Sequence, residues 1–436
     1  MEHPLETAKE DHLYLNGADL VELSIKYGTP LFVFDEKRLR ENYRRFRDAF
    51  SRNYPKTIVC YSVKTNYNLL LCKRMQEEGA YAEVASGLDL HVARKAGFTP
   101  DHLVFDGLFK PETALREAIA NGVLLINAES FTELANINKI AGMMGKKQKV
   151  GIRVNNIQAK RLGSEAIYCN PLTRFGFSPE EAYKAFKTAE KFENLDIKGI
   201  MTHPYWGIHQ FLPFVKRIQD ELGIQMEYIN FGGGFEKSST KIGLPDLIKD
   251  MARQTIGLET RLDAGKKKEP RAIEKTGELV AAEVRETLGN DEATLIFEPG
   301  RYIIHDAGLL LLRVGVIKEA GGFKWLVVDG GTNLNSDWLE RKKIIVANKA
   351  SAPAAETVNV VGPLLFARDF VTIKKTLPKV EEGDTLAVFN SGAYTLSNST
   401  QFLNPRPCAV LVDENGKATV ARRRETYDYI LAMDEN

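Results

Sequence analysis

Several features that define other classes of protein are scarce in these 436 residues. There are four cysteines, Cys60, Cys72, Cys169 and Cys408, and none belongs to a CxxC pair. They give no disulfide framework and no metal-site pattern, so we predict no metal and a reducing compartment. No apolar run approaches the ~18–20 residues that a membrane-spanning helix needs. The first residues are acidic and polar, unlike a secretory signal. We therefore expect a cytoplasmic protein with no membrane partner.

An excess of charge of one sign is also missing. Lys and Arg number 59 and Asp and Glu 58, so the formal net charge is +1. Nucleic acids select clustered positive charge, so we expect no nucleic-acid partner. Hydrophobic residues make up 44% and charged residues 27%, which is ordinary for a globular protein and excludes wholesale disorder.

Between residues 30 and 300 the chain alternates short apolar runs with longer amphipathic stretches. This alternation is typical of parallel strands joined by helical crossovers. Eight such runs predict a closed (β/α)8 barrel. They are Pro30–Phe34, Thr57–Tyr61, Leu103–Phe105, Leu124–Ile126, Val150–Val154, Ile197–Met201, Tyr228–Phe231 and Thr294–Phe297.

After residue 305 the pattern changes to strand-like runs joined by Gly, Asn and Asp turns. Little helix is expected between them, which predicts an antiparallel β domain. The runs are Leu309–Ile317, Trp325–Val328, Ile344–Val346, Thr357–Val361, Thr385–Phe389 and Ala409–Val412.

One lysine follows a predicted barrel strand, in the sequence YSVKTN, where it is Lys64. The C-terminal ends of barrel strands face the active site. A lysine in such a partly desolvated mouth is a candidate for Schiff-base formation with a carbonyl group. The alternative is a lysine that points into solvent, and this motif alone leaves both open.

Two further segments offer groups that could hold a phosphate. In NFGGGF, the glycines Gly232, Gly233 and Gly234 would let backbone N–H groups approach a phosphate closely, although a tight turn also explains them. EPGR ends the last predicted barrel strand and contributes Glu298 and Arg301. The carboxylate could pair with a pyridinium nitrogen and the guanidinium could clamp a phosphate. A surface ion pair is the alternative.

Two ring side chains complete the candidate set. His203 closes the strand Ile197–Met201, where an imidazole could stack on a planar cofactor or play a structural part. Tyr394 lies in the GAY sequence of the predicted β domain. It could donate a hydrogen bond to a phosphate or simply be half-buried.

The order of these groups resembles that of the fold type III pyridoxal-phosphate amino-acid decarboxylases. The similarity is strongest to the diaminopimelate branch of the diaminopimelate/ornithine/arginine decarboxylase family, and it covers nearly the whole chain. The segments that carry it are YGTPLFVFDEKRLRENYRRF (27–46), YSVKTN (61–66), EVASGLDL (83–90), FDGLFK (105–110), INAESFTEL (126–134), RVN (153–155), TRFGF (173–177), NFGGGF (230–235), EPGRYI (298–303), GPL (362–364), GAY (392–394) and PRP (405–407).

The resemblance implies pyridoxal 5'-phosphate as cofactor and a role for each matching residue. Lys64 would hold the cofactor as a Schiff base, and Glu298 would keep the pyridine nitrogen protonated. His203 would stack on the ring, and Lys64 and His203 would be the catalytic residues. The other implied cofactor contacts are Glu83, Arg153, Gly232, Gly233, Gly234, Gly300, Arg301 and Tyr394.

The resemblance also implies a fold and an assembly. The α/β fold would be a TIM-like (β/α)8 barrel of the alanine-racemase kind over residues 34–306, plus a C-terminal antiparallel β domain. Residues 1–33 and 307–436 would form that β domain from both chain ends. Active sites in this family form between two subunits, so a homodimer is expected. The implied reaction removes the α-carboxylate of an amino acid as CO₂.

The segment that matches the family's GPLC motif departs from it. Leu365 stands at the position of the cysteine, and Phe366 at a position that often contacts the distal amine of the substrate; Arg368 and Asp369 follow. Leucine cannot donate a proton. We therefore expect the Schiff-base lysine to return the proton to the product, with the stacking histidine or a water molecule as the alternative.

Other departures bear on the substrate. Trp206 adds bulk near the family's HxHxGS segment, and no arginine follows the turn at 329–333 to hold a distal carboxylate. With Phe366 and Arg368, these changes argue against plain diaminopimelate, ornithine or arginine. They favour a larger, less cationic or anionic amino-acid-derived substrate, such as a conjugated or carrier-linked amino acid of a specialised biosynthetic pathway.

Two other functions stay open on the sequence alone. An amino-acid racemase or epimerase would share the fold and the cofactor, but it needs a second acid–base group opposite Lys64, which we do not identify. A catalytically inactive decarboxylase-like binding protein would fit the missing cysteine, but not the retained cofactor residues.

Overall fold

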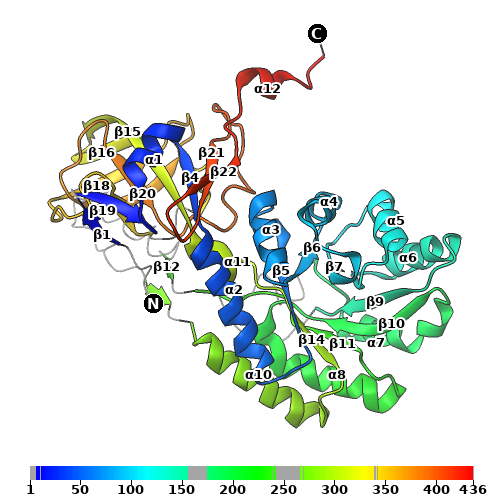
Figure 1. Cartoon of the computed structure of the whole chain (residues 1–436). Coiled ribbons are helices and arrows are strands. Elements are labelled where there is room, and N and C mark those ends of the chain that lie inside the picture. Colours follow the sequence, from blue (N-terminus) through cyan, green and yellow to red (C-terminus); the bar gives the residue numbers. More distant parts are fainter. Residues whose placement is uncertain are drawn as a thin grey trace. The chain divides into compact units, whose positions relative to one another are not determined.

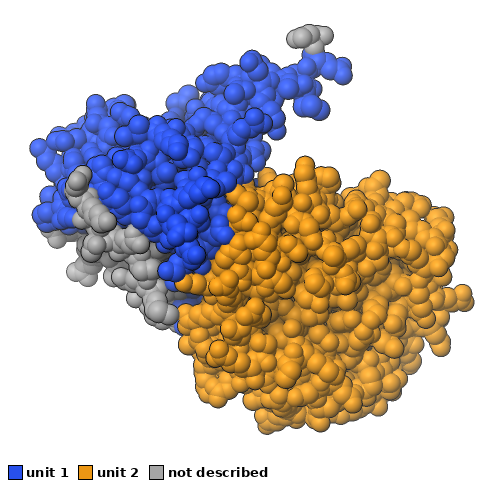
Figure 2. All heavy atoms as spheres, in the orientation of Figure 1, with its two compact units in different colours: residues 1–39, 236–270, 304–436 blue, residues 40–235, 271–303 orange. Residues whose placement is uncertain are grey.

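The computed structural model describes residues 6–9, 11–155, 174–237, 239–241, 266–268, 270–337, 340 and 342–435. The chain divides into two compact units (Figure 2). Unit 1 comprises the described residues within 1–39, 236–270 and 304–436, and unit 2 those within 40–235 and 271–303. The barrel domain predicted from the sequence was one continuous stretch. In the structure the described residues of 236–270 group instead with the chain ends.

Within the described residues, unit 2 is a closed barrel of eight parallel strands (Figure 1). Seven follow in chain order from β5 to β11, and β14 closes the barrel between β11 and β5. Their bounds are β5 Thr57–Ser62, β6 Tyr81–Val84, β7 Leu103–Phe105, β8 Leu125–Ala128, β9 Gln148–Arg153, β10 Leu195–Met201, β11 Tyr228–Asn230 and β14 Thr294–Phe297.

Helices alternate with these strands, and short polar side chains start several of them. An Asn or Ser side chain accepts a hydrogen bond from a first-turn backbone N–H in α3, α4, α6 and α7, as expected of N-caps. The α-helices are α2 Glu36–Ser51, α3 Leu69–Glu77, α4 Gly87–Ala96, α5 Glu112–Asn121, α6 Phe131–Met143, α7 Pro179–Lys187, α8 Ile208–Leu222, α10 Ile273–Leu288 and α11 Arg301–Ile304. Short 3-10 turns are η1 Val63–Thr65, η2 Pro100–His102, η4 Ala189–Lys191, η5 Tyr205–Gly207 and, in unit 1, η6 His305–Ala307.

One of the eight predicted barrel strands was wrong. The run Pro30–Phe34 forms β4 (Leu31–Asp35) in the sheet of unit 1, antiparallel to β15 and parallel to β21. All residues of β4 are buried, so its pattern matches that of a barrel strand. The strand that was missed is β6, which is short and carries Glu83 in its middle. The glutamate interrupts the apolar pattern from which strands were predicted, although most residues of β6 are buried.

Unit 1 is a mostly antiparallel β domain built from both chain ends (Figure 1). The main sheet has the strand order β19-β18-β16-β15-β4-β21-β22, with β20 paired to β15 and β17 to β20. The predicted fold class is therefore confirmed. The elements are β1 Glu6–Lys9, β2 His12–Leu15, β3 Ala18–Asp19, α1 Leu20–Tyr27, β4, β12 Ser239–Lys241, β13 Lys266–Lys268, β15 Gly308–Ala320, β16 Phe323–Val328, β17 Ile344–Val346, β18 Glu356–Val361, β19 Phe370–Leu377, β20 Thr385–Val388, β21 Cys408–Val412, β22 Ala418–Arg422 and α12 Tyr427–Leu431.

The helices leave no candidate for a transmembrane segment. In the part of the chain that the structure describes, none of them is both long and apolar enough to cross a membrane.

Candidate active site

Lys64 lies just beyond the C-terminal end of β5, in the single turn η1. The turn is short because Asn68 starts α3 four residues later, where its side chain accepts hydrogen bonds from two backbone N–H groups. The Lys64 side chain is 45% exposed, and its Nζ donates to both carboxylate oxygens of Glu83, at 2.5 and 2.6 Å. A reactive amine is thus held at the mouth of the barrel on a buried anion.

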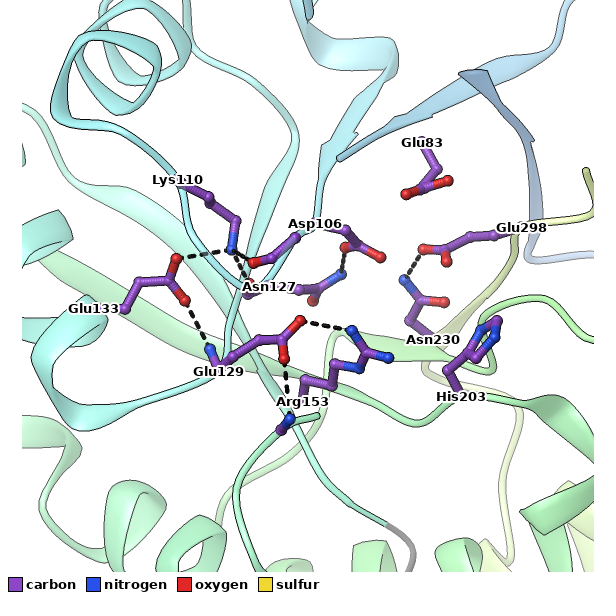
Figure 3. A network of polar contacts seen from close by, with 12 residues as sticks. Glu83, Asp106, Lys110, Asn127, Glu129, Glu133, Arg153, His203, Asn230 and Glu298 are labelled. Carbon is purple, nitrogen blue, oxygen red and sulfur yellow. Dashed lines mark hydrogen bonds and ion pairs between the residues drawn. The ribbon is translucent and has the colours of Figure 1, made fainter. Parts of the chain in front are cut away.

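Glu83 belongs to a group of three buried carboxyl groups at the ends of different strands. Asp106 directly follows β7 and Glu298 directly follows β14. One carboxylate oxygen from each of Glu83, Asp106 and Glu298 lies within 4.8 Å of the other two, and Figure 3 shows the three side chains converging. The Lys64 ammonium group already contacts both oxygens of Glu83, so one carboxylate of this cluster is paired with a cation of the protein itself.

Burial and mutual repulsion change the acidity of these groups. Burial, and then the neighbouring Glu83 carboxylate, raise the pKa of Asp106 to about 6. Burial, followed by the charges of Asp106 and Glu83, raises the pKa of Glu298 well above its usual range. Perturbed carboxyl groups of this kind are typical of functional sites.

Two asparagine amides orient the cluster. Asn127 Nδ2 donates to Asp106 Oδ1 at 2.7 Å, and Asn230 Nδ2 donates to Glu298 Oε1 at 2.6 Å. The other end of Asn230 accepts the backbone N–H of Gly232 at 2.8 Å. Asn230 therefore ties the Glu298 carboxyl group to the glycine loop.

The glycine loop after β11 packs directly on its neighbours. Gly232 and Gly234 have φ angles of +62° and +90°, which disfavour other residues. A Cβ at Gly232 would lie 2.7 Å from His203 Nδ1, and one at Gly234 would lie 2.4 Å from the Pro204 Cβ. The loop thus packs too closely on His203 and Pro204 to accommodate side chains at these two positions.

His203 is held by this loop and stays neutral. Its Nδ1 accepts the backbone N–H of Gly233 at 2.9 Å. Burial, and then the charges of Arg153 and Lys64, lower the pKa of His203 to about 3. The imidazole is therefore uncharged near neutral pH. This environment suits a fixed planar ring better than a proton donor.

Arg153, the last residue of β9, is fixed by a second carboxylate. Its Nη1 donates to Glu129 Oε1 at 2.6 Å, and its guanidinium lies 4.7 Å from the centre of the Phe175 ring. The other Glu129 oxygen accepts the backbone N–H of Gly176 at 2.9 Å. Figure 3 shows the guanidinium between Glu129 and His203.

A buried lysine completes this network behind Arg153. Lys110 is fully buried, and its Nζ donates to the carbonyl oxygens of Gly107 and Asn127 and to Glu133 Oε1, at 2.8, 2.8 and 2.9 Å. Glu133 Oε2 in turn accepts the backbone N–H of Glu129 at 2.7 Å. The chain of contacts from Lys110 to Arg153 joins the ends of β7, β8 and β9 (Figure 3).

Replacing Lys110 with methionine is expected to destabilise the protein by about 3–5 kcal/mol, because it leaves the Glu133 carboxylate buried without its cation. Urea unfolding measures this change. Lys110→Met with Glu133→Gln should recover part of the loss. Lys216→Met is the matched control, since Lys216 pairs with Asp220 on an exposed helix face and such pairs contribute at most about 1 kcal/mol. Equal losses in the two lysine variants would contradict this account.

The remaining predicted residues fall in two places. In unit 2, Gly300 packs on the Lys64 turn, where a Cβ would lie 2.0 Å from Thr65 Oγ1. Arg301 begins α11 three residues after Glu298, and Trp206 is half-buried in η5.

Tyr394 and the residues of the divergent segment belong to unit 1. Leu365 and Phe366 are 92% and 55% exposed, and Arg368 is also exposed. Asp369 is buried, and its oxygens accept hydrogen bonds from the backbone N–H groups of Thr332 and Leu364 at 2.7 and 2.8 Å. In this chain Asp369 thus links two turns of unit 1.

Sequence reasoning missed several polar groups of the site. Asp106, Asn127 and Asn230 lie at or just after the ends of barrel strands, and Lys110 and Glu133 in the connections that follow β7 and β8. The rule that strand ends face the active site could have selected the first three. No sequence signal pairs Lys110 with Glu133, because the two are 23 residues apart.

The geometry fits the cofactor that the sequence suggested. A lysine at the barrel mouth, a buried carboxyl group opposite it, and a glycine loop that leaves no room for side chains are what pyridoxal phosphate requires of its amine, ring-nitrogen and phosphate partners. The fold and the site define a barrel-type pyridoxal-phosphate enzyme.

The comparisons with known proteins specify the family. The model of the "Pyridoxal-dependent decarboxylase, pyridoxal binding domain" matches residues 36–305. Diaminopimelate decarboxylase from Aquifex aeolicus is 30% identical, with 98% of this chain and 97% of that protein covered. The one from Methanothermobacter thermautotrophicus is 33% identical, with 98% and 96% covered. The chain therefore belongs to the pyridoxal-dependent decarboxylase family.

A solved structure shows the same relationship. The diaminopimelate decarboxylase from M. jannaschii has a TM-score of 0.83 and 27% identity, with 100% of this chain and 98% of that chain covered. The protein is thus a pyridoxal-phosphate-dependent carboxy-lyase similar to the diaminopimelate decarboxylases. These relatives carry the name of a decarboxylase rather than of a racemase.

Proposed function

We propose that the protein removes the α-carboxylate of an amino-acid conjugate rather than of free diaminopimelate or ornithine. One observation supports decarboxylation by this site: Lys64 Nζ donates to both oxygens of Glu83, and Glu298 lies in the same buried carboxyl cluster. Bound pyridoxal phosphate supplies an electron sink for the pair left when CO₂ departs. The chain's own residues bind, orient and protonate.

The roles follow from the contacts. Lys64 Nζ is the amine that attaches the cofactor, and Glu83 holds that amine in place when it is not attached. Glu298 is the carboxyl group for the ring nitrogen. The glycine loop of residues 232–234 is assigned to the phosphate together with Gly300 and Arg301, although the N–H groups of Gly232 and Gly233 donate to Asn230 and His203 in this structure. The family resemblance assigns the Tyr394 hydroxyl to the same group.

The proton that replaces the carboxylate comes from Lys64. This residue carries a proton when it is released as an ammonium ion, and it is already at the barrel mouth. His203 is the weaker candidate, because its low pKa leaves it without a proton to give at Nδ1, which accepts from Gly233. The imidazole instead serves as a flat surface for the cofactor ring.

The substrate class rests on the divergent segment and on Trp206. Phe366 and Arg368 are exposed and offer an apolar surface and a positive charge. Trp206, half-buried in η5, adds bulk after β10. An apolar surface beside a guanidinium suits a bulky or anionic distal group rather than the free ammonium group of ornithine.

We further propose that the protein acts as a homodimer in the cytoplasm. Leu365 and Phe366 are exposed apolar side chains in the segment that we assign to the substrate. A partner subunit would cover them and share the active site.

Free diaminopimelate is the second candidate substrate. It is favoured by the two relatives that are 30% and 33% identical to this chain. Both are named for that activity, and both align over nearly their whole length.

A substrate panel decides between the two. CO₂ release should be followed with free diaminopimelate, ornithine and lysine, and with the same amino acids acylated at the distal amine by a dicarboxylic acid. We expect kcat/KM to be at least about tenfold higher for an acylated member, and Arg368→Ala to lower only that value, by about 10–100-fold for a lost charged hydrogen bond. Arg423→Ala, which replaces another arginine of unit 1, is the control. Turnover confined to free diaminopimelate would contradict the proposal.

A further inference from the structure

A third carboxyl group lies beside the two to which the family resemblance assigns roles. Asp106 is buried, and its Oδ1 accepts one hydrogen bond, from Asn127 Nδ2 at 2.7 Å. One of its oxygens lies within 4.8 Å of one oxygen of Glu298 and one of Glu83. Figure 3 shows the Asp106 and Glu298 carboxyl groups facing each other across the barrel mouth.

The positive side chains near this pair bind other carboxylates directly, although the charges of Arg153 and Lys64 partly offset the burial that raises the pKa of Asp106, and that of Lys64 partly offsets the burial that raises the pKa of Glu298. Lys64 Nζ lies on Glu83, and Arg153 Nη1 lies on Glu129. Of the other titratable groups nearby, burial raises the pKa of the Cys60 thiol and lowers that of His203, so both are neutral near pH 7.

Ionising both carboxyl groups in a buried site, with oxygens within 4.8 Å of each other, would cost considerable free energy. Each receives an amide hydrogen bond, from Asn127 in one case and Asn230 in the other, but neither has a directly bound cation comparable to Lys64 on Glu83. In such pairs one group keeps its proton to a higher pH than either would alone.

We propose that Asp106 and Glu298 form a carboxyl pair that holds one proton between them, and that Asp106 is thereby a positioning residue for the carboxylate offered to the cofactor. With one shared proton the pair carries a single negative charge. One oxygen of the pair stays anionic, while the cluster avoids a third buried charge beside Glu83. The inference concerns the cofactor side of the site and does not depend on which substrate is turned over.

A proton titration of the full chain tests this pair. The carboxylic-acid C=O band is followed by infrared difference spectroscopy against pH, after the cofactor has been removed. For the wild type we expect two steps that belong to the pair. For Asp106→Asn, which keeps the amide contact but not the charge, the upper step should move down by about one pH unit or more, which is at least tenfold in proton affinity.

The matched control lies at the other end of the same strand. Asp101 is exposed just before β7, and Asp101→Asn should leave both steps in place. If Asp106→Asn does not fold, Glu298→Gln tests the same coupling from the other side, because the remaining Asp106 step should then fall. An upper step that stays in place in either variant would overturn the pair. Substrate is absent throughout, so failure here is distinct from failure of the proposed reaction.

Discussion

Replacing Lys64 with alanine is expected to abolish CO₂ release, with a loss of at least about 10³-fold in kcat. Lys64 contributes both the covalent attachment and the proton, and a positioned acid–base group alone accounts for about 10²–10⁴-fold. The variant should also lose the near-visible absorbance band of the bound cofactor. Both readings are taken on purified protein, with the best substrate of the panel.

The control for this variant lies beside the other end of the same strand. Lys56 precedes β5 just as Lys64 follows it, and its exposed Nζ contacts only the carbonyl oxygen of Glu292 among the contacts described. Lys56→Ala should keep the absorbance and the activity. Retention of more than a tenth of the activity by Lys64→Ala would remove Lys64 from the chemistry.

Glu298→Gln is expected to keep the cofactor attached but to lower kcat by about 10²–10³-fold. The amide cannot supply the negative charge that keeps a ring nitrogen protonated, and the loss of one such electrostatic partner has this size in other active sites. The near-visible band should remain, since attachment depends on Lys64. Single-turnover CO₂ release separates the chemical step from binding.

Glu292→Gln tests whether any change near β14 would have the same effect. Glu292 is exposed just before that strand, whereas Glu298 is buried just after it. The control should behave as the wild type. A Glu298→Gln variant with unchanged kcat would show that the ring nitrogen has another partner in the cluster, with Asp106 the first to examine.

The barrel was predictable because its strands repeat one simple pattern. Runs such as Leu103–Phe105 are buried and apolar, and the helix that follows this one, α5, has one buried apolar face. The pattern failed at β4 and β6 for opposite reasons. β4 is as apolar as a barrel strand but pairs in the other unit, and β6 is a barrel strand that carries a buried glutamate. Pairing partners cannot be read from periodicity.

Candidate site residues could be selected from the sequence where a reactive side chain follows a predicted barrel strand. Lys64 and Glu298 were selected on that ground. In the structure both lie next to Glu83: Lys64 Nζ donates to its carboxylate, and Glu298 belongs to the same carboxyl cluster. Asp106 was not selected as a site residue, because a single aspartate after a strand is also typical of a turn. Its significance comes from the distance to Glu298, which depends on how β7 and β14 are placed in the closed barrel.

Chemical mapping of the cofactor attachment tests the central claim most directly. The purified protein is reduced with borohydride, digested, and searched by mass spectrometry for the pyridoxyl-modified lysine. The account predicts one modified peptide, with the label on Lys64. A label on Lys110 or another lysine, or no label on protein that retains decarboxylase activity, would contradict it.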